Sequence, residues 1–229
     1  MQGILLVDKP AGWTSFDVVN YVRRIVATAE GKKPKNCKVG HTGTLDPFAT
    51  GLLVLLIGKE YTRQAQSLSK ADKTYEVIMQ LGTTSTTGDP EGELSIVSGV
   101  VPTKAALQEV LEQFRGQITQ IPPIYSAIKV NGQRAYALAR AGQAVAMVPR
   151  PATIHRLEVS DYTYPLIAYS ADVGSGTYLR TLSEDIATAL GSCAYTIALR
   201  RTRVGRFTVA DACQVDGLNP EKILERLLV

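Results

Sequence analysis

A glycine-flanked apolar run, GLLVLLIG at residues 51–58, most constrains how this chain can fold. Its length and flanking glycines are typical of a buried strand, although periodicity alone leaves a buried helix open. The run follows directly on the polar segment KVGHTGTLDPFAT, which contains one carboxylate, Asp46. A core strand does not require that aspartate, and a surface loop does not require the apolar run. We therefore predict a buried strand that follows a loop presenting Asp46.

Strand and helix patterns alternate along the rest of the chain without a regular βαβ order. Strands are predicted within residues 3–10, 73–82, 167–176 and 194–207. Helices are predicted within residues 15–30 (N-cap Ser15), 103–116 (N-cap Thr103), 177–191 and 220–229. Residues 31–36 and 83–93 are predicted to be polar loops. This mixture favours an α+β fold with helices packed on a mainly antiparallel sheet.

Length and composition restrict the class of protein. The chain has 229 residues, 45% of them hydrophobic, and no linker marks a second domain, so a single domain over 1–229 is expected. No apolar run reaches the ~18 residues of a membrane span. The N-terminus lacks the basic start and cleavage site of a secretory signal. Three scattered cysteines favour reduced thiols, so a cytoplasmic protein is expected.

The formal net charge of +4 is unevenly distributed. Residues 129–206 contain ten Lys or Arg and five Asp or Glu, and the remainder of the chain is mildly acidic. A basic half suits a polyanion bound on one side of the molecule. A solvated surface with uneven charge explains the same counts equally well, so charge alone leaves both interpretations open.

Several common kinds of site are not supported by the sequence. It contains no Walker loop, no G-x-G-x-x-G and no G-x-S-x-G elbow. His41 and His155 are far apart, and no cysteine pair has zinc-ligand spacing. We therefore expect neither a metal nor a cofactor.

Asp46 and Arg180 are the first candidates for chemistry. Pro47 biases Asp46 toward an extended backbone, and the surrounding glycines permit close approach of another chain segment. Arg180 is predicted in the first helical turn, where a cation opposes the helix dipole, so a carboxylate partner is expected. A pair of the two would hold Asp46 ionised and able to act as a nucleophile. An ordinary Asp-Pro turn and a purely structural salt bridge remain open alternatives.

Tyr75 and a run of arginines complete the candidate set. Tyr75 falls on the apolar face of its strand, where core packing is the default, but at a cleft edge its ring could stack on a base. Alternation in RRTRVGRF puts Arg201 and Arg203 on one strand face, where they could track phosphates. A charge-protected edge strand is the other interpretation.

Taken together, six segments resemble one family over nearly the whole chain: the bacterial tRNA pseudouridine synthases of the TruB type, which modify uridine 55 in the TΨC loop. The segments occur in the family's order, and they are DKPAGWTSFDVV, KVGHTGTLDPFATGLL, DKTYEV, IPPIYSAIKVNGQRAYALARAG, GTYLRTL and LRRTRVGRF. The resemblance implies the pseudouridine synthase fold, with a mixed, mainly antiparallel sheet flanked by helices. It also implies isomerisation of a flipped uridine without any cofactor.

The resemblance also implies roles for individual residues. By motif position, Asp46 matches the catalytic aspartate, Tyr75 the tyrosine that stacks on the uracil, and Arg180 the arginine that pairs with the aspartate. His41 and Tyr178 match residues that contact the substrate, and Leu199 matches a leucine that lines the uracil pocket. Lys9 and Pro10 match a pair that supports the catalytic loop. Residues 120–147 match a thumb that closes on RNA, and its Asn131-Gly132 turn interrupts the regular pattern.

Three expectations about partners follow. The resemblance implies that tRNA is the partner, bound by a monomer without an obligatory protein partner or a membrane. The chain ends shortly after GRFTVADACQVDGL, so the family's small C-terminal RNA-binding domain is expected to be absent. Two alternatives remain open: a tRNA-folding chaperone that uses the same cleft without required catalysis, and a synthase directed by a guide RNA.

Overall fold

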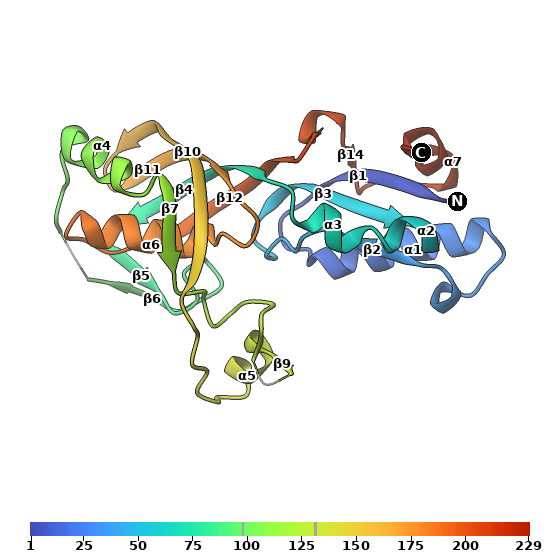
Figure 1. Ribbon diagram of the computed structural model, residues 1–229, viewed down its shortest axis with the longest axis horizontal. Coiled ribbons are helices and arrows are strands. Elements are labelled where there is room, and N and C mark those ends of the chain that lie inside the picture. The colour runs from blue at the N-terminus through green and yellow to red at the C-terminus, as the bar shows by residue number, and fades with distance from the viewer. Residues whose placement is uncertain (98, 131) are drawn as a thin grey trace. The chain divides into compact units, whose positions relative to one another are not determined.

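The computed structural model describes residues 1–97, 99–130 and 132–229, which form two compact units. The first unit contains Met1–Tyr75 and Arg200–Val229, and the second contains Glu76–Leu199. The chain passes from one unit to the other within β4 (Lys73–Leu81) and again within β12 (Ala194–Val204) (Figure 1).

The first unit is built on a small mixed sheet. Its elements are β1 (Gly3–Lys9), α1 (Ser15–Ala29), the 3-10 helix η1 (Pro34–Asn36), β2 (Val39–His41), β3 (Thr50–Ile57), α2 (Lys59–Thr62), α3 (Ala65–Ser69), β13 (Phe207–Thr208), η2 (Val209–Asp211), β14 (Cys213–Gln214) and α7 (Pro220–Arg226). The strand order is β14-β1-β3-β12, with β2 also paired to β3 and β13 to β12. β1 and β2 are antiparallel to β3, whereas β12 is parallel to it.

The apolar run is β3, and it is buried on both faces, which explains why it lacks a polar alternation. Its side chains divide between two clusters by strand alternation. Leu53, Leu55 and Ile57 pack with the α1 side chains Val18 and Val22. The other three, Leu52, Val54 and Leu56, pack with Val204 and Phe207. The predicted strand at residues 51–58 is therefore confirmed, and its position is central.

The N-cap predicted for the first helix is wrong by one residue. Thr14, not Ser15, caps α1: the Thr14 hydroxyl accepts from the Asp17 amide, and the Asp17 carboxylate accepts from the Thr14 amide. Thr14 and Asp17 thus form a reciprocal capping box, with aspartate in place of the usual Glu or Gln. Ser15 is displaced from this role because its side chain is buried and points to the loop after β2.

The second unit has a sheet with helices against it. Its elements are β5 (Thr83–Ser85), β6 (Leu94–Ile96), α4 (Lys104–Gln113), β7 (Gly116–Gln120), β8 (Lys129–Val130), β9 (Gln133–Arg134), α5 (Ala135–Arg140), β10 (Arg150–Thr163), β11 (Leu166–Val173) and α6 (Leu179–Ala189). The strand order is β12-β4-β11-β10-β7, and β10 is antiparallel to both of its neighbours. In β4 the predicted alternation is confirmed, with Tyr75, Val77, Met79 and Leu81 buried.

Two further predictions for this unit had different outcomes. Thr103 caps α4 as expected, by accepting from the Ala106 amide. The predicted polar loop at 83–93 is only partly correct, because Thr83–Ser85 pairs with Leu94–Ile96 as a short antiparallel ribbon. Loop residues with β-branched threonines can extend into a strand when a partner segment lies alongside.

The segment between β7 and β10 projects from the strands of the second unit, and its described residues form β8, β9 and α5 with loops between them (Figure 1). Most of its residues are exposed. The predicted Asn-Gly turn cannot be assessed because Asn131 lies outside the described residues.

The architecture confirms the predicted α+β class with a mixed, mainly antiparallel sheet. All three cysteines carry free thiols. Within the described ranges, no helix has both the length and the apolar character needed to cross a bilayer.

Candidate active site

The loop that carries Asp46 connects β2 to β3 and is attached by its backbone to the start of α1. The buried Ser15 hydroxyl accepts from the Leu45 amide at 2.8 Å and donates to the Leu45 carbonyl at 3.0 Å. The Gly12 amide donates to the Pro47 carbonyl at 2.9 Å. These bonds fix the backbone on both sides of Asp46, so the point from which its side chain projects is set before any substrate arrives.

Lys9 supports the same loop from the end of β1. Its side chain is fully buried, and its ammonium group donates to the carbonyls of Pro10, Trp13 and Pro47 at 2.8, 2.7 and 3.1 Å. Three carbonyl acceptors use all three ammonium protons. This geometry agrees with the supporting role that the resemblance implied for Lys9 and Pro10.

Arg201 holds the other side of the loop, and the prediction that it binds RNA phosphates is wrong. Its side chain is 1% exposed, so it cannot reach a phosphate at the surface. The guanidinium donates to the carbonyls of Leu52, Gly43 and Thr44 at 2.8, 3.0 and 3.4 Å. Strand alternation predicted the face correctly, but that face is turned into the protein. Arg203 is half-buried and donates to Thr74 Oγ1 and the Gly205 carbonyl, and its role toward RNA stays a prediction.

Gly51 allows β3 and β12 to approach closely at Arg201. Its φ is +101°, and a Cβ at this position would lie 2.3 Å from the Arg201 carbonyl oxygen. A larger residue would push β3 away from β12 at the point where Arg201 reaches the loop.

Lys73 adds a third buried cation near the loop. Its Cε would lie 3.6 Å from a Cβ built on Gly43, and its ammonium group donates to the carbonyls of Ser69 and Ala71. Burial, and next the charge of Arg201, lower the pKa of Lys73 to about 8. Buried cations close to the Asp46 loop create a positive local potential, which favours the ionised form of a carboxylate carried by that loop.

His41 ends β2, five residues before Asp46. Among the residues described, its buried Nδ1 has no partner with hydrogen-bond geometry. Burial, and next the Arg201 charge, lower the pKa of His41, so the ring is neutral at neutral pH. A neutral imidazole with an unused ring nitrogen can donate to or accept from a substrate group.

In the second unit, Arg180 lies in the first turn of α6 and is 4% exposed. Its guanidinium donates to Asp89 Oδ2 at 3.0 Å and to the carbonyls of Thr87 and Tyr125 at 2.7 and 2.8 Å. The expectation that a cation in this turn needs a carboxylate partner is confirmed, and Asp89 is one such partner. The ion pair between Arg180 and Asp46 stays a prediction. Asp46 belongs to the first unit and Arg180 to the second.

Asp89 was missed by the sequence reasoning. It is 4% exposed and also accepts from Thr87 Oγ1 at 2.6 Å and the Glu91 amide at 3.0 Å. The available signal was a second Asp-Pro step, at residues 89–90, within a threonine-rich segment that was interpreted as an ordinary polar loop. Glu184 lies beside Gly88, and burial raises the pKa of its carboxyl group while Arg180 opposes the shift.

Tyr178 occupies the N-cap position of α6. Its amide donates to Gln120 Oε1 at 3.1 Å, and Gln120 Nε2 donates to its carbonyl at 3.2 Å. Gln120, at the end of β7, is 2% exposed and was also missed. This double hydrogen bond fixes the backbone of Tyr178 and with it the start of the helix that carries Arg180.

The candidate residues thus form one group in each unit. In the first unit the structure brings Lys9, Pro10 and Arg201 to the Asp46 loop, and Tyr75 is buried in β4. In the second unit it brings Tyr178 and Arg180 together on α6, and Leu199 is buried in β12. No cluster of three or more His, Cys, Asp or Glu side chains suited to a metal occurs in the described part of the chain.

Comparisons with known proteins identify the family of this chain. The N-terminal domain model of the TruB family pseudouridylate synthases matches residues 30–179, and a tRNA pseudouridylate synthase B C-terminal domain model matches residues 180–227. The tRNA pseudouridine synthase B of Pseudomonas fluorescens (strain Pf0-1) is 46% identical over 95% of this chain and 68% of its own length. That of Azoarcus sp. (strain BH72) is 45% identical over 95% of this chain and 70% of its own.

Two solved structures share the fold. The crystal structure of a Cbf5-Nop10-Gar1 complex has a chain 30% identical to this one, with a TM-score of 0.69 over 93% of this chain and 52% of that chain. An H/ACA RNP bound to a substrate RNA containing 2′-deoxyuridine has a chain 27% identical, with a TM-score of 0.67 over 93% of this chain and 51% of that one. This chain therefore spans about half of those chains and about two thirds of the curated relatives.

Proposed function

Because this chain belongs to the TruB family of pseudouridylate synthases, we propose that it converts uridine 55 in the TΨC loop of tRNA to pseudouridine. The observation that carries the proposal is the Asp46 loop, whose backbone is held by Ser15, Lys9 and Arg201. Such a loop presents one carboxylate in a fixed position, as nucleophilic catalysis requires. The matched relatives are synthases, so a chaperone role without catalysis is not favoured.

The first step is extrusion of the target uridine from the folded loop. Unstacking the base costs a few kcal/mol. Stacking of the uracil on Tyr75 and a hydrogen bond to the neutral His41 offset this cost. His41 suits the task because burial lowers its pKa, so that a neutral ring directly precedes the Asp46 loop.

The second step is exchange of the glycosidic bond. The Asp46 carboxylate attacks either C1′ of the ribose or the uracil ring, and the C1′–N1 bond breaks. The detached uracil turns, and C5 bonds to C1′ as the bond to Asp46 is released. C5 then loses its proton, with Tyr75 assisting, and N1 gains one, so substrate and product have the same composition. Arg180 keeps Asp46 ionised until the attack, and Leu199 lines the uracil pocket.

The remaining expectations belong to the same proposal. The protein acts as a monomer in the cytoplasm, with tRNA as its partner and without a cofactor. Arg203 contacts the RNA backbone, Tyr178 contacts the substrate, and residues 120–147 close on the RNA as a thumb. Residues 1–229 are sufficient for the reaction.

The direct test uses an unmodified tRNA transcript and the purified protein in a buffer without cofactors. We expect pseudouridine at position 55 and at no other uridine of that transcript. A transcript that stays unmodified, while it binds and refolds in the presence of the protein, would support the chaperone alternative and contradict the proposal.

A further inference from the structure

A second group of cations lies outside the candidate active site. Six Lys or Arg and one acidic residue occur between Tyr21 and His41. The acidic residue, Glu30, is paired with Lys32 and with the N-terminal amine. Arg24, Lys33, Lys35 and Lys38 are exposed, and no described carboxylate lies within ion-pair distance of them. The net charge of all residues outside 129–206 is mildly acidic, so a charge count over that whole part of the chain does not reveal this local group.

These four cationic residues lie on, or directly beside, regular secondary structure. Arg24 lies on α1, Lys33 and Lys35 lie at η1, and Lys38 directly precedes β2. The Arg23 guanidinium ties the helix to that strand by donating to the Val39 carbonyl at 3.0 Å. Like charges held close together on rigid elements repel one another, and an anionic partner relieves that repulsion. We call the exposed face of α1 with residues 33–38 the α1–β2 surface.

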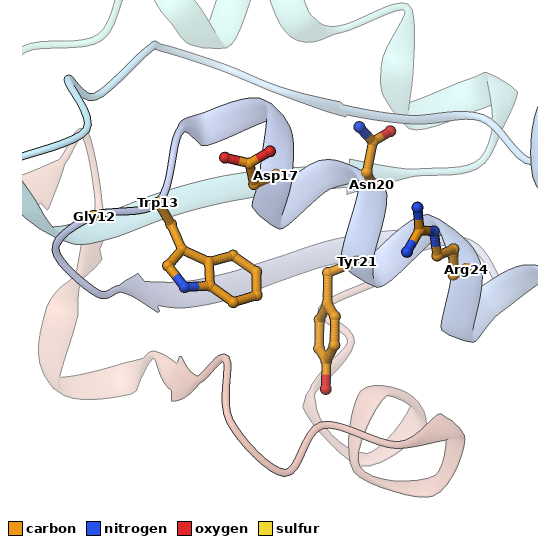
Figure 2. Close-up of a pocket in the computed structure, with 6 residues that line it drawn as sticks. All are labelled: Gly12, Trp13, Asp17, Asn20, Tyr21 and Arg24. Carbon is orange, nitrogen blue, oxygen red and sulfur yellow. The ribbon is translucent and has the colours of Figure 1, made fainter.

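A pocket of about 350 Å³ lies along α1 and shares Arg24 with this surface. It is lined by Gly12, Trp13, Asp17, Asn20, Tyr21 and Arg24. Figure 2 shows Trp13 and Tyr21 next to each other at α1, with Arg24 one turn further along the helix. The two rings meet edge to face, with centroids 5.7 Å apart and an interplanar angle of 86°.

Two polar side chains that line this pocket already have partners within the protein. Asp17 Oδ2 accepts from the amide and hydroxyl of Thr14, and Asn20 Oδ1 accepts from Arg23 at 2.7 Å. The pocket also offers a ligand two aromatic rings and the Arg24 guanidinium. Aromatic rings beside a cationic track are the combination that binds unpaired nucleotides.

We propose that the α1–β2 surface is a second RNA-binding site of this protein. Arg24, Lys33, Lys35 and Lys38 bind phosphates, and the pocket lined by Trp13, Tyr21 and Arg24 receives one unstacked base. The inference rests on the proposed function, because it assumes an RNA substrate. His41 follows Lys38 by three residues, or ~10 Å of strand, so one RNA can reach both this surface and the Asp46 loop.

The first test compares the salt dependence of binding to an unmodified tRNA transcript. One variant carries Lys33→Gln, Lys35→Gln and Lys38→Gln. Its matched control carries Lys59→Gln, Lys70→Gln and Lys104→Gln, which removes three exposed lysine charges elsewhere. Each lost phosphate contact lowers the slope of log Kd against log salt by ~0.7 to 0.9. We expect the slope to fall by about 2 in the first variant and to stay unchanged in the control. Equal slopes in both would overturn the proposal.

The second test uses Trp13, the single tryptophan of the chain, as a reporter. Stacking of a base in the pocket should quench its fluorescence at saturating tRNA. The triple variant should need a higher tRNA concentration for the same quench. Unchanged Trp13 emission in a complex demonstrated by filter binding would overturn the assignment of the pocket to a base.

Both tests read binding and are independent of turnover. If pseudouridine forms but the two slopes agree, the α1–β2 proposal fails while the proposed function stands. If the slopes differ but no pseudouridine forms, the surface binds RNA and the proposed function fails. Binding to phosphatidylserine vesicles that is lost in the first variant, with no change in its RNA slope, would assign the surface to lipid and contradict an RNA site.

Discussion

The two groups of candidate residues are held in opposite ways. In the first unit, buried cations hold the backbone of the loop that carries a carboxylate, Asp46. In the second unit, a buried carboxylate, Asp89, holds the side chain of a cation, Arg180. The first arrangement fixes the backbone from which the Asp46 side chain projects. The second fixes the guanidinium at the far end of the Arg180 side chain. Substitutions in the first should therefore disturb the loop as a whole, whereas those in the second should act on one guanidinium.

The largest effect is expected from Arg201→Met, which keeps the apolar stem and removes the guanidinium. Three buried carbonyl oxygens lose their donor, at about 1 to 3 kcal/mol each. Relief from burying a charge offsets part of this, so we expect the free energy of unfolding to fall by about 4 kcal/mol. Denaturant titration measures it.

Arg206→Met is the matched control, because Arg206 is exposed and its guanidinium lies over the Phe207 ring, without a hydrogen bond or ion pair to any of the described residues. Its loss should cost less than about 1 kcal/mol. A similar small loss for Arg201→Met would mean that the loop keeps its shape without its buried cation.

Asp89→Asn tests the second arrangement. Removing one partner of a buried ion pair costs about 3 to 5 kcal/mol, and the two carbonyls that Arg180 also binds place the expected loss near 3 kcal/mol. The rate of pseudouridine formation should fall as well, because Arg180 is no longer held in one orientation. Asp172→Asn removes a partly exposed partner of Arg156 and should cost at most about 0.5 kcal/mol. Equal losses in the two variants would contradict the role of Asp89.

Ser15→Ala should cost about 2 to 3 kcal/mol, less than the changes above. The buried amide and carbonyl of Leu45 both lose their side-chain partner. Ser69→Ala removes an exposed hydroxyl that donates to Gln66 and should cost under about 1 kcal/mol. Thermal unfolding of the two variants side by side would reveal whether Ser15 anchors the loop or merely fills space.

The smallest effect is a pH dependence from Lys73. Its pKa is about 8 in the folded protein and 10.5 in the unfolded chain, so between these values the unfolded state binds more protons. Stability must then rise with pH, by about 2 kcal/mol between pH 8 and pH 10. The increase should appear as a difference between the wild-type protein and Lys73→Met, in which the other titrating groups cancel. Parallel stability curves would show that Lys73 keeps an ordinary pKa.

The sequence predicted the first group better than the second, for a physical reason. The Asp46 loop is assembled from two short contiguous motifs, so its composition and turn chemistry are visible in the chain. The surroundings of Tyr178 and Arg180 come from two distant segments, one that contributes Asp89 and one that contributes Gln120 and Tyr125. No local pattern marks such residues, because their partners meet only after the sheet of the second unit has formed.

Arg201 shows the limit of pattern reasoning within a well-predicted strand. Alternation predicts which side chains of β12 share a face, but it does not tell which face is covered. The Arg201 guanidinium donates to the carbonyls of Leu52, Gly43 and Thr44, so the residue expected to contact RNA instead supports the loop.

The most direct measurement is the single-turnover rate of pseudouridine formation at position 55 by Asp46→Asn, made together with its affinity for the same tRNA transcript. We expect the product to be lost, a fall of at least ~10³-fold, because an amide cannot replace the carboxylate as nucleophile. The Kd should stay within a few-fold of the wild-type value. Pseudouridine formation at a rate close to that of the wild-type protein would contradict the assignment of catalysis to Asp46.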